Sequence, residues 1–332
     1  MKALITTVPF GKIDNEPLEL LNAAGIEVNI NPIGRKLTEL ELADLIPGHQ
    51  ILIAGTEKIT DLVLDKASEL KLISRVGIGL DSVDLWAARE RNIEVSYTPD
   101  APSPAVAELT IALMLSLMRH VQLSNIGIKS GVWHRHFGKR ICDSVVGIVG
   151  VGRIGKLVVS HLLNFGCKKI LINDINGAVL KTFRSESVEW CEKNEIYKDA
   201  DVISLHVPLT ATTLNMIAEK ELENMKPGAC LVNTSRGGIV NEKDLESVLR
   251  TGHLSGVALD VFEQEPYDGP LAQIDRCILT AHMGSMSQDC RVAMEIEAVE
   301  EAVRLANGAP LVSLVPEEEY LIQSQREQRL SS

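Results

Sequence analysis

The fold of this chain is decided by the stretch Ser144-Val145-Val146-Gly147-Ile148-Val149-Gly150-Val151-Gly152-Arg153-Ile154-Gly155. Its first half has the apolar pattern of a buried strand, and its second half is a GxGxxG turn that opens the apolar helix pattern Ile154–Leu163. The glycine string alone occurs by chance, but a strand before it and a helix after it are the context of a dinucleotide-binding βαβ unit. Gly150 permits the tight turn, Gly152 lets a pyrophosphate approach the backbone, and Gly155 lets helix and strand pack closely.

An acidic residue stands where the next strand is expected to end. Asp174 follows the strand pattern Ile170–Asn173, ~20 residues after the glycines, as the dinucleotide fingerprint requires. Its carboxylate accepts hydrogen bonds from ribose hydroxyls and would repel a 2′-phosphate, and the neighbouring Ile175 offers no compensating cation. We therefore expect NAD as the cofactor in preference to NADP. The rival interpretation is a glycine turn that only packs.

Short apolar runs alternate with helical patterns along most of the chain, which predicts βαβ units and parallel sheets. A first series of strands is expected at residues 3–6, 27–30, 50–54, 71–76 and 93–97, with helices at 16–24, 38–45, 61–66 and 82–91. A second series of strands is expected at residues 144–149, 170–173, 201–206, 229–233, 256–259 and 277–281. The fold class is therefore α/β with two doubly wound parallel-sheet domains, a Rossmann NAD-binding domain and a smaller, flavodoxin-like substrate domain.

The boundary between the two domains is indicated by three prolines within residues 98–104, which forbid regular structure and suit a hinge. Ser103 as N-cap and Pro104 at the first position are expected to start a long helix that reaches Ser124 or beyond, before an irregular stretch to Asp143.

The end of the chain is expected to return to the first domain. The helix pattern Gln288–Asn307 has no sheet of its own after it, and the polar residues from Pro316 onward indicate a loosely held tail. The expected domains are residues 1–99 plus 288–332 for the substrate domain and residues 100–287 for the NAD-binding domain.

Composition limits the classes of partner. The chain has 332 residues, 45% of them hydrophobic, and a formal net charge of −12 without a long basic run, so neither nucleic acid nor an anionic membrane is an expected partner. The most apolar helix pattern, Ala105–Met118, is interrupted by Glu108 and is shorter than the ~20 residues that span a bilayer. The N-terminus lacks the features of a signal peptide, so we expect a cytoplasmic protein. His134 and His136 lack acidic or cysteine companions, so no metal site is expected.

Polar clusters follow three of the expected strands, in the segments Asn233–Gly238, Asp260–Pro266 and Ala281–Ser285. Ligands of doubly wound sheets bind at the carboxyl ends of the strands, which is where these clusters lie. Together with Ser74–Asp84, the glycine turn and Leu205–Thr210, taken in order, they resemble the D-isomer-specific 2-hydroxyacid dehydrogenases, and within them the phosphoglycerate dehydrogenase branch. The resemblance covers nearly the whole chain.

The resemblance implies an NAD-dependent oxidoreductase that acts on the CH–OH group of a D-2-hydroxy acid, or reduces the 2-oxo acid, with 3-phosphoglycerate among the candidate substrates. It implies a catalytic trio of Arg236, Glu265 and His282. Imidazole, with an ordinary pKa of ~6.5, is suited to move the hydroxyl proton, which is the role of His282. Glu265 would orient the ring, and the planar guanidinium of Arg236 would hold the substrate carboxylate.

The same resemblance implies the remaining site residues. The substrate-binding residues are Val76, Gly77, Ile78, Arg236 and His282. The cofactor-binding residues are Ile78, Gly150, Gly152, Arg153, Ile154, Gly155, Asp174, His206, Val207, Pro208, Thr234, Ser235, Arg236, Asp260, His282, Gly284 and Ser285. Asp260 would face the nicotinamide carboxamide.

Departures from the family pattern leave the substrate open. Phosphoglycerate-specific relatives carry an arginine near the end of the third strand, whereas this chain has Ile53–Lys58 there. The basic stretch Trp133–Arg140 would supply a cation to a partner subunit, or it is a solvated loop. A homodimer is expected because Ala105–Met118 and the loop after it match the family's dimer interface.

Three alternative functions have the same fold. One is a glyoxylate or hydroxypyruvate reductase, and another is an NADH-sensing corepressor-like protein that binds peptides on its first domain. The third is an enzyme of formate or phosphite, and Glu265 argues against formate because formate enzymes of this fold carry an amide there.

Overall fold

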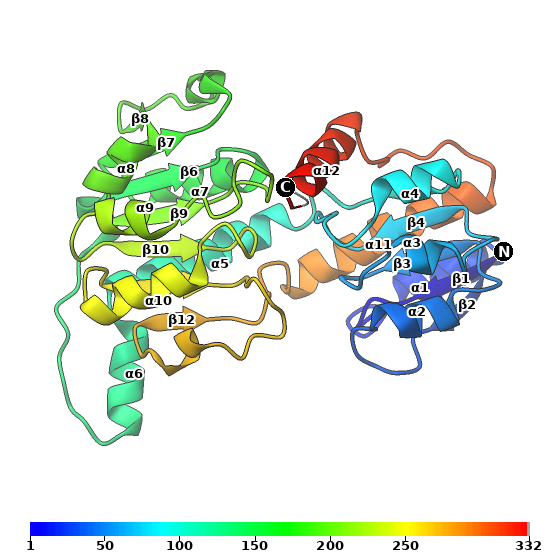
Figure 1. Cartoon of the computed structure of the whole chain (residues 1–332), viewed down its shortest axis with the longest axis horizontal. Coiled ribbons are helices and arrows are strands. Elements are labelled where there is room, and N and C mark those ends of the chain that lie inside the picture. Colours follow the sequence, from blue (N-terminus) through cyan, green and yellow to red (C-terminus); the bar gives the residue numbers. More distant parts are fainter. Residues whose placement is uncertain (331–332) are drawn as a thin grey trace. The chain divides into compact units, whose positions relative to one another are not determined.

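The computed structural model describes the backbone of residues 1–330 and the side chains of residues 1–324. The chain divides into two compact units (Figure 1). Unit 1 consists of Met1–Pro102 and the C-terminal segment that begins at Ser285, and unit 2 is Ser103–Gly284.

Unit 1 is built on a five-stranded sheet in the order β2-β1-β3-β4-β5, with every pair parallel. The strands are β1 (Lys2–Ile5), β2 (Glu27–Ile30), β3 (Ile51–Ala54), β4 (Leu72–Arg75) and β5 (Glu94–Ser96). This is the flavodoxin-like order of a doubly wound sheet. The central strand β3 is buried at all four residues, because helices cover both faces.

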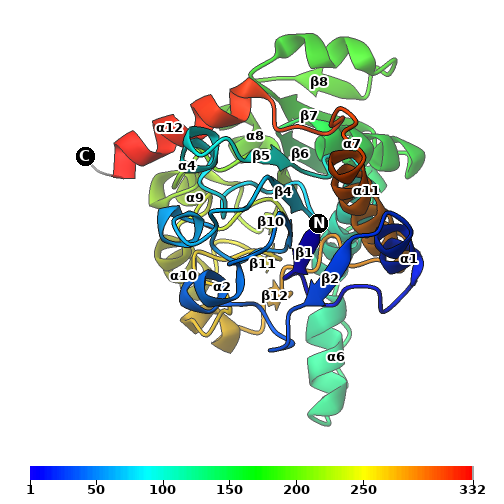
Figure 2. The same ribbon diagram turned by 90° about the vertical axis from the view of Figure 1, so that its right-hand side faces the viewer.

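The helices of unit 1 form two layers. One layer consists of α1 (Glu16–Ala23) and α11 (Gln288–Ala306), and the other of α2 (Glu39–Leu45), α3 (Asp61–Leu64) and α4 (Leu85–Glu90), as Figure 2 shows. Helix α11 packs on β3 and β4, and the hydroxyl of Ser74 donates to the carbonyl of Ala298 at 2.8 Å.

The expectation of a loosely held C-terminal tail is wrong, because the segment forms helix α12 (Glu317–Leu330) beside α4. The buried ring of Tyr320 meets Trp86 edge to face and lies under the guanidinium of Arg89. Gln323 accepts from the N–H of Leu85 at 2.9 Å and donates to the carbonyl of Val83 at 2.7 Å. The polar composition concealed a helix that depends on these few contacts. The last two residues of the predicted tail lie outside the described residues.

Unit 2 is built on a seven-stranded parallel sheet in the order β12-β11-β10-β9-β6-β7-β8. Its strands are β6 (Val145–Val149), β7 (Lys169–Asn173), β8 (Val188–Trp190), β9 (Val202–Leu205), β10 (Cys230–Asn233), β11 (Gly256–Leu259) and β12 (Cys277–Leu279). The order reverses between β6 and β9, which is the switch point where a Rossmann sheet binds its dinucleotide. The three-residue edge strand β8 was not expected from the sequence.

Helices α5 (Ser103–Met118) and α7 (Arg153–Asn164) pack together on one face of this sheet. The other face carries α8 (Lys193–Asp199), α9 (Glu219–Asn224) and α10 (Glu242–Thr251). Short 3₁₀ helices lie at η1 (Ile141–Asp143), η2 (Gly177–Thr182) and η3 (Pro270–Gln273).

Two details of the expected long helix are wrong. The helix breaks after Met118, where His120 adopts a left-handed conformation with φ 53°, and α6 (Val121–Lys129) continues at an angle of 64°. Histidine is one of the residues that tolerate this conformation, so the apolar pattern gave no warning of the break. Ser103 lies inside the helix, and its buried hydroxyl has no partner among the described residues, so it is not the N-cap.

Within the described residues, no single helix is long and apolar enough to cross a membrane. The bent pair of α5 and α6 would satisfy that test only by length and composition.

A charge cluster stabilises the start of β9. The carboxylate of Asp201 accepts from Lys139 and Lys226, each at 2.8 Å, and from the N–H of Val145 at 2.9 Å. Burial raises the pKa of Asp201, but these hydrogen bonds outweigh it and lower the pKa to about 2. The cluster thereby ties the loop before η1 to the centre of the sheet.

Asp201→Asn is expected to lower the free energy of unfolding by ~1–2 kcal/mol at pH 7, less than the full pKa difference because both lysines are partly exposed. The folded pKa of Asp201 lies below the unfolded value of ~3.9, so this stability is present above pH ~4 and is lost as the pH falls towards 2. Urea unfolding at pH 7, 5 and 3 should show a gap between wild type and variant that narrows with acid. A gap that is absent at pH 7 or grows with acid would contradict this assignment.

Candidate active site

The glycine turn between β6 and α7 shows which of its glycines are required by packing. Gly150 has φ 92°, and a Cβ on it would strike the carbonyl of His206; a Cβ on Gly155 would strike the carbonyl of Gly150. Gly152 has an ordinary φ, and an added Cβ would have no heavy atom of the described chain within 4 Å. The chain itself therefore needs Gly150 and Gly155, whereas Gly152 leaves open space at the N-terminus of α7, where backbone N–H groups and the helix dipole favour a phosphate.

Asp174, directly after β7, is held against this turn. Its Oδ2 accepts from the N–H of Val151 at 2.7 Å, and its Oδ1 accepts from the N–H of Asn176 at 2.8 Å. The side chain of Ile175 is fully exposed next to it. The carboxylate is thus fixed at the carboxyl edge of β7, close to the glycine turn, which is where the fingerprint places an acid for the ribose.

His206, at the end of β9, is an uncharged neighbour of the turn. Its Nε2 lies 2.9 Å from the hydroxyl of Ser204, and its buried Nδ1 has no partner among the described residues. Burial lowers the pKa of His206 to about 4, so the ring is neutral at physiological pH. A neutral ring of this kind does not supply a proton at physiological pH, and its place among the residues that line the cofactor stays a prediction.

The loop after β10 carries Arg236 and is fixed by Asn233. The buried Asn233 accepts from the N–H and the hydroxyl of Ser235 at 3.1 and 2.8 Å, and it donates to the carbonyl of Arg236 at 2.9 Å. The Thr234 hydroxyl lies 2.8 Å from that of Thr110 on α5. The side-chain amide of Asn233 therefore holds the backbone at both Ser235 and Arg236.

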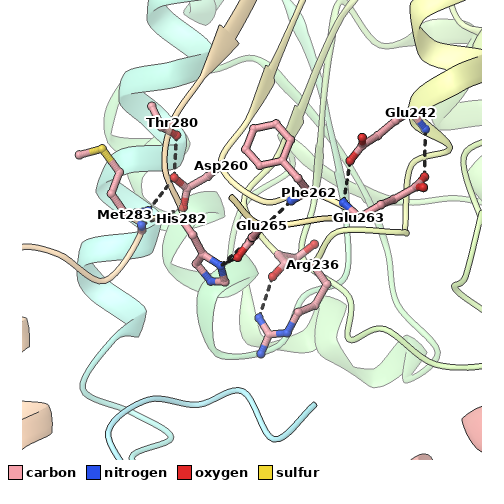
Figure 3. A network of polar contacts seen from close by, with 11 residues as sticks. Arg236, Glu242, Asp260, Phe262, Glu263, Glu265, Thr280, His282 and Met283 are labelled. Carbon is pink, nitrogen blue, oxygen red and sulfur yellow. Dashed lines mark hydrogen bonds and ion pairs between the residues drawn. The ribbon is translucent and has the colours of Figure 1, made fainter. Parts of the chain in front are cut away.

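The loop after β11 brings Glu265 to His282, which follows β12 (Figure 3). The Nδ1 of His282 lies 2.9 Å from Oε2 and 3.1 Å from Oε1 of Glu265, and Oε1 also accepts from the N–H of Phe262 at 3.2 Å. Since Nδ1 faces the carboxylate, Nε2 is the nitrogen left for a ligand. The arrangement is that of a general acid–base histidine whose ring is oriented by an acid.

The loops of Arg236 and Glu265 touch through a glycine. A Cβ on Gly237 would strike the carbonyl of Phe262 and approach the nitrogen of Glu263. Glycine at this position lets the two loops pack backbone against backbone.

Asp260 organises the segment around His282. Its carboxylate, 1% exposed, accepts from the Thr280 hydroxyl at 2.6 Å and from the N–H groups of Met283 and Gly284 at 2.8 Å each (Figure 3). His282 lies between them with a left-handed φ of 49°, and its N–H donates to the carbonyls of Asp260 and Thr280. Three donors of this chain occupy the carboxylate, so its contact with a nicotinamide stays a prediction.

In unit 1, the expected substrate loop follows β4. Gly77 has φ 141°, and its N–H donates to the hydroxyl of Thr98 at 2.8 Å. The N–H groups of Ile78 and Gly79 donate to no acceptor within the described residues. These two amides are suited to an anionic group.

An arginine does lie at the end of β3, although residues 53–58 contain none. The guanidinium of Arg75, the last residue of β4, donates to the carbonyls of Ala54 and Gly55 and also to that of Gly79, at 2.8 Å from Nη2. Beside it, the carboxylate of Glu57, 1% exposed, accepts from the N–H of Gly55 at 3.0 Å and from the hydroxyl of Thr6. The end of β3 therefore lies between Arg75, which comes from the neighbouring strand β4, and the buried carboxylate of Glu57.

The structure distributes the predicted residues over both units. Unit 2 gathers the trio, the glycine turn, Asp174, residues 206–208, Thr234, Ser235, Asp260 and Gly284 at the carboxyl edge of its sheet, whereas Val76, Gly77, Ile78 and Ser285 belong to unit 1. Sequence reasoning assigned no role to Asn233, Arg75 or Glu57. Their signal was present, since each is a polar residue at or just after the end of an apolar strand. No group of metal-binding side chains was found within the described residues.

The comparisons with known proteins agree with this geometry. Residues 111–284 match the model of the D-isomer specific 2-hydroxyacid dehydrogenase family, NAD binding domain. The chain is 37% identical to D-3-phosphoglycerate dehydrogenase of Methanocaldococcus jannaschii over 85% of its own length, and it spans 54% of that protein. It is 34% identical to hydroxypyruvate reductase of Thermotoga maritima, covering 86% of this chain and 95% of the relative.

A solved structure shows the same architecture. The D-lactate dehydrogenase of Aquifex aeolicus, complexed with NAD and lactic acid, superposes with a TM-score of 0.80 at 25% identity, over 93% of this chain and 96% of that one. The chain therefore belongs to the D-isomer specific 2-hydroxyacid dehydrogenase family, and residues 111–284 match its NAD-binding domain. It spans about half the length of the phosphoglycerate dehydrogenase that it matches.

Gly152→Ala is expected to weaken NADH binding at least ~10-fold while leaving the melting temperature of the free protein unchanged. The new methyl group meets nothing in the chain but stands where the pyrophosphate must approach the backbone. Fluorescence titration with NADH and thermal unfolding measure the two effects, with Ser160→Ala on the exposed face of α7 as the control. Wild-type affinity in the Gly152 variant would show that the phosphates bind elsewhere.

Proposed function

We propose that the chain is an NAD-dependent oxidoreductase of D-2-hydroxy acids that interconverts a 2-hydroxy acid and its 2-oxo acid. The observation that carries this proposal is the pairing of Glu265 with Nδ1 of His282 at 2.9 Å, beside the loop of Arg236. A proton-transfer group and a permanent cation are the two things that hydride transfer to a 2-oxo acid requires of a protein.

The roles follow from the chemistry of each side chain. NADH, when bound, supplies the hydride to the carbonyl carbon. His282 donates the proton from Nε2 to the carbonyl oxygen, while Glu265 holds Nδ1–H and stabilises the charged ring. Arg236 binds the substrate carboxylate and polarises the carbonyl with its planar guanidinium. In oxidation the same groups act in reverse, and His282 accepts the hydroxyl proton.

Cofactor binding and substrate binding would fall to different units. We assign NAD binding to unit 2 and the substrate loop, with the amides of Ile78 and Gly79, to unit 1. NAD is preferred over NADP because the carboxylate of Asp174 is fixed at the glycine turn, where it would repel a 2′-phosphate.

One observation favours an unphosphorylated substrate, and with it the second candidate, a hydroxypyruvate or glyoxylate reductase. The buried carboxylate of Glu57 shares the end of β3 with Arg75, whose guanidinium is engaged by backbone carbonyls. A phosphate dianion brought to this edge would meet the buried carboxylate of Glu57, while the neighbouring cation, Arg75, already donates to the carbonyls of Ala54, Gly55 and Gly79.

The test is a screen of glyoxylate, hydroxypyruvate, phosphohydroxypyruvate and 2-oxoglutarate with NADH and NADPH. We expect turnover with NADH, preference for an unphosphorylated acid, and a loss of at least ~10³-fold in kcat/KM in His282→Asn and Arg236→Ala. Unchanged turnover in both variants would contradict the trio. Failure of every 2-oxo acid together with tight NADH binding would favour the corepressor-like alternative.

We also propose a cytoplasmic homodimer that binds neither nucleic acid nor membrane. Its support is the net charge of −12 and the apolar groove of about 810 Å³ along α5 and α6. The side chains of Val121, Ile128, Trp133 and Phe137 are more than half exposed along this groove and the loop that follows it. Large exposed apolar side chains of this kind are typical of a protein interface.

Ile128→Glu is expected to dissociate the dimer, because the carboxylate would be buried without a partner at the interface. Sedimentation should give about twice the chain mass of 36.3 kDa for wild type and the single mass for the variant. Leu40→Glu, at a leucine of α2 that is 67% exposed against 53% for Ile128, is the control and should stay dimeric. A monomeric wild type would refute the dimer.

A further inference from the structure

A second pair of carboxylates joins the Glu265 loop to helix α10. The N–H of Glu242, the first residue of α10, donates to Oε1 of Glu263 at 3.2 Å, and the N–H of Glu263 donates to Oε1 of Glu242 at 2.7 Å (Figure 3). Each residue thus gives its N–H to the carboxylate of the other. We call this closed pair the Glu242–Glu263 latch.

The latch acts on the backbone that holds Glu265. The N–H groups of two successive residues, Phe262 and Glu263, point at two carboxylates, those of Glu265 and Glu242. On its other side the same stretch lies so close to Gly237 that a Cβ added there would strike the carbonyl of Phe262. The loop is therefore fixed between the Arg236 loop and the start of α10.

The latch brings like charges together. Burial raises the pKa of Glu242, and the charges of Glu263 and Glu265 raise it further, against the opposing effect of the Glu263 N–H. The N-terminus of α10 favours negative charge and so offsets part of this repulsion. This repulsion lies in the loop that carries Glu265, where a displacement would move the acid that contacts His282.

We infer that Glu242 is a positioning residue for the Glu265–His282 pair: through its hydrogen bond to the Glu263 N–H it holds Glu265 on Nδ1 of the histidine. Its use in catalysis rests on the proposed function. Within the described residues, the ionisable groups near the Glu265–His282 pair include Glu242 of α10, Glu263 and Tyr267 of the same loop, Asp260 at the end of β11 and Arg236 after β10.

The test compares Glu242→Ala, which removes the acceptor, with Glu242→Gln, whose amide oxygen accepts the same hydrogen bond. The alanine variant is expected to lose ~10-fold in kcat with the KM for NADH within ~2-fold of wild type, because misplacement of an orienting group affects the chemical step. The glutamine variant should recover kcat to within ~3-fold.

Glu246→Ala, one turn further along α10 and paired with Arg250, is the matched control and should behave as wild type. Melting temperatures show that each variant is folded. The inference is overturned if the alanine variant keeps the kcat of wild type, or if the glutamine variant falls as far as the alanine variant.

An NMR spectrum of the His282 ring, without substrate, separates this inference from the proposed function. The signal of the Nδ1–H proton, which is hydrogen-bonded to Glu265, should be weakened or lost to exchange with solvent in Glu242→Ala and unchanged in Glu246→Ala. If the wild type turns over no 2-oxo acid, the proposed function fails, and the latch is still judged by this spectrum. An unchanged Nδ1–H signal in Glu242→Ala would refute the latch.

Discussion

The hydrogen bonds that the buried carboxylate of Asp260 accepts are the interaction on which the geometry of the candidate active site depends. It lies at the end of β11 and accepts hydrogen bonds from the Thr280 hydroxyl and from the two N–H groups that follow His282. An unpaired buried carboxylate would be costly, so the segment after β12 is held where its donors meet that charge. His282 lies in the middle of that segment. The hydrogen bonds of Asp260 to the residues on either side therefore fix the backbone from which the His282 ring reaches Glu265.

The neighbouring loops repeat this arrangement of buried polar side chains that hold backbone. Asn233 fixes the loop of Arg236, and Gly237 lets that loop pack directly on the loop of Glu265. A parallel sheet brings all these strand ends to one edge, but it does not orient the side chains. Orientation within ~0.5 Å comes from the supporting hydrogen bonds, as precise chemistry requires.

The sequence predicted most strands to within a few residues, because buried parallel strands carry uninterrupted apolar runs between clear turn signals. The prediction failed for α12, which is polar and is held by tertiary contacts of Tyr320 and Gln323. It also missed the helix break at His120, because a left-handed backbone conformation leaves no mark in the hydrophobic pattern of the sequence. At the site, resemblance supplied the identities of Arg236, Glu265 and His282. It supplied neither the role of Asn233 nor the reach of Arg75 to the end of β3, because both depend on which backbone groups meet in the fold.

The most direct test of the account is the fate of the hydride. Reduction of a 2-oxo acid with NADH deuterated at C4 of the nicotinamide, followed by NMR and chiral analysis of the product, measures transfer and stereochemistry together. The account predicts deuterium at C2 of a D-2-hydroxy acid, with the hydroxyl proton derived from solvent through His282. A product of L configuration, or one without deuterium at C2 from either C4 epimer, would contradict it.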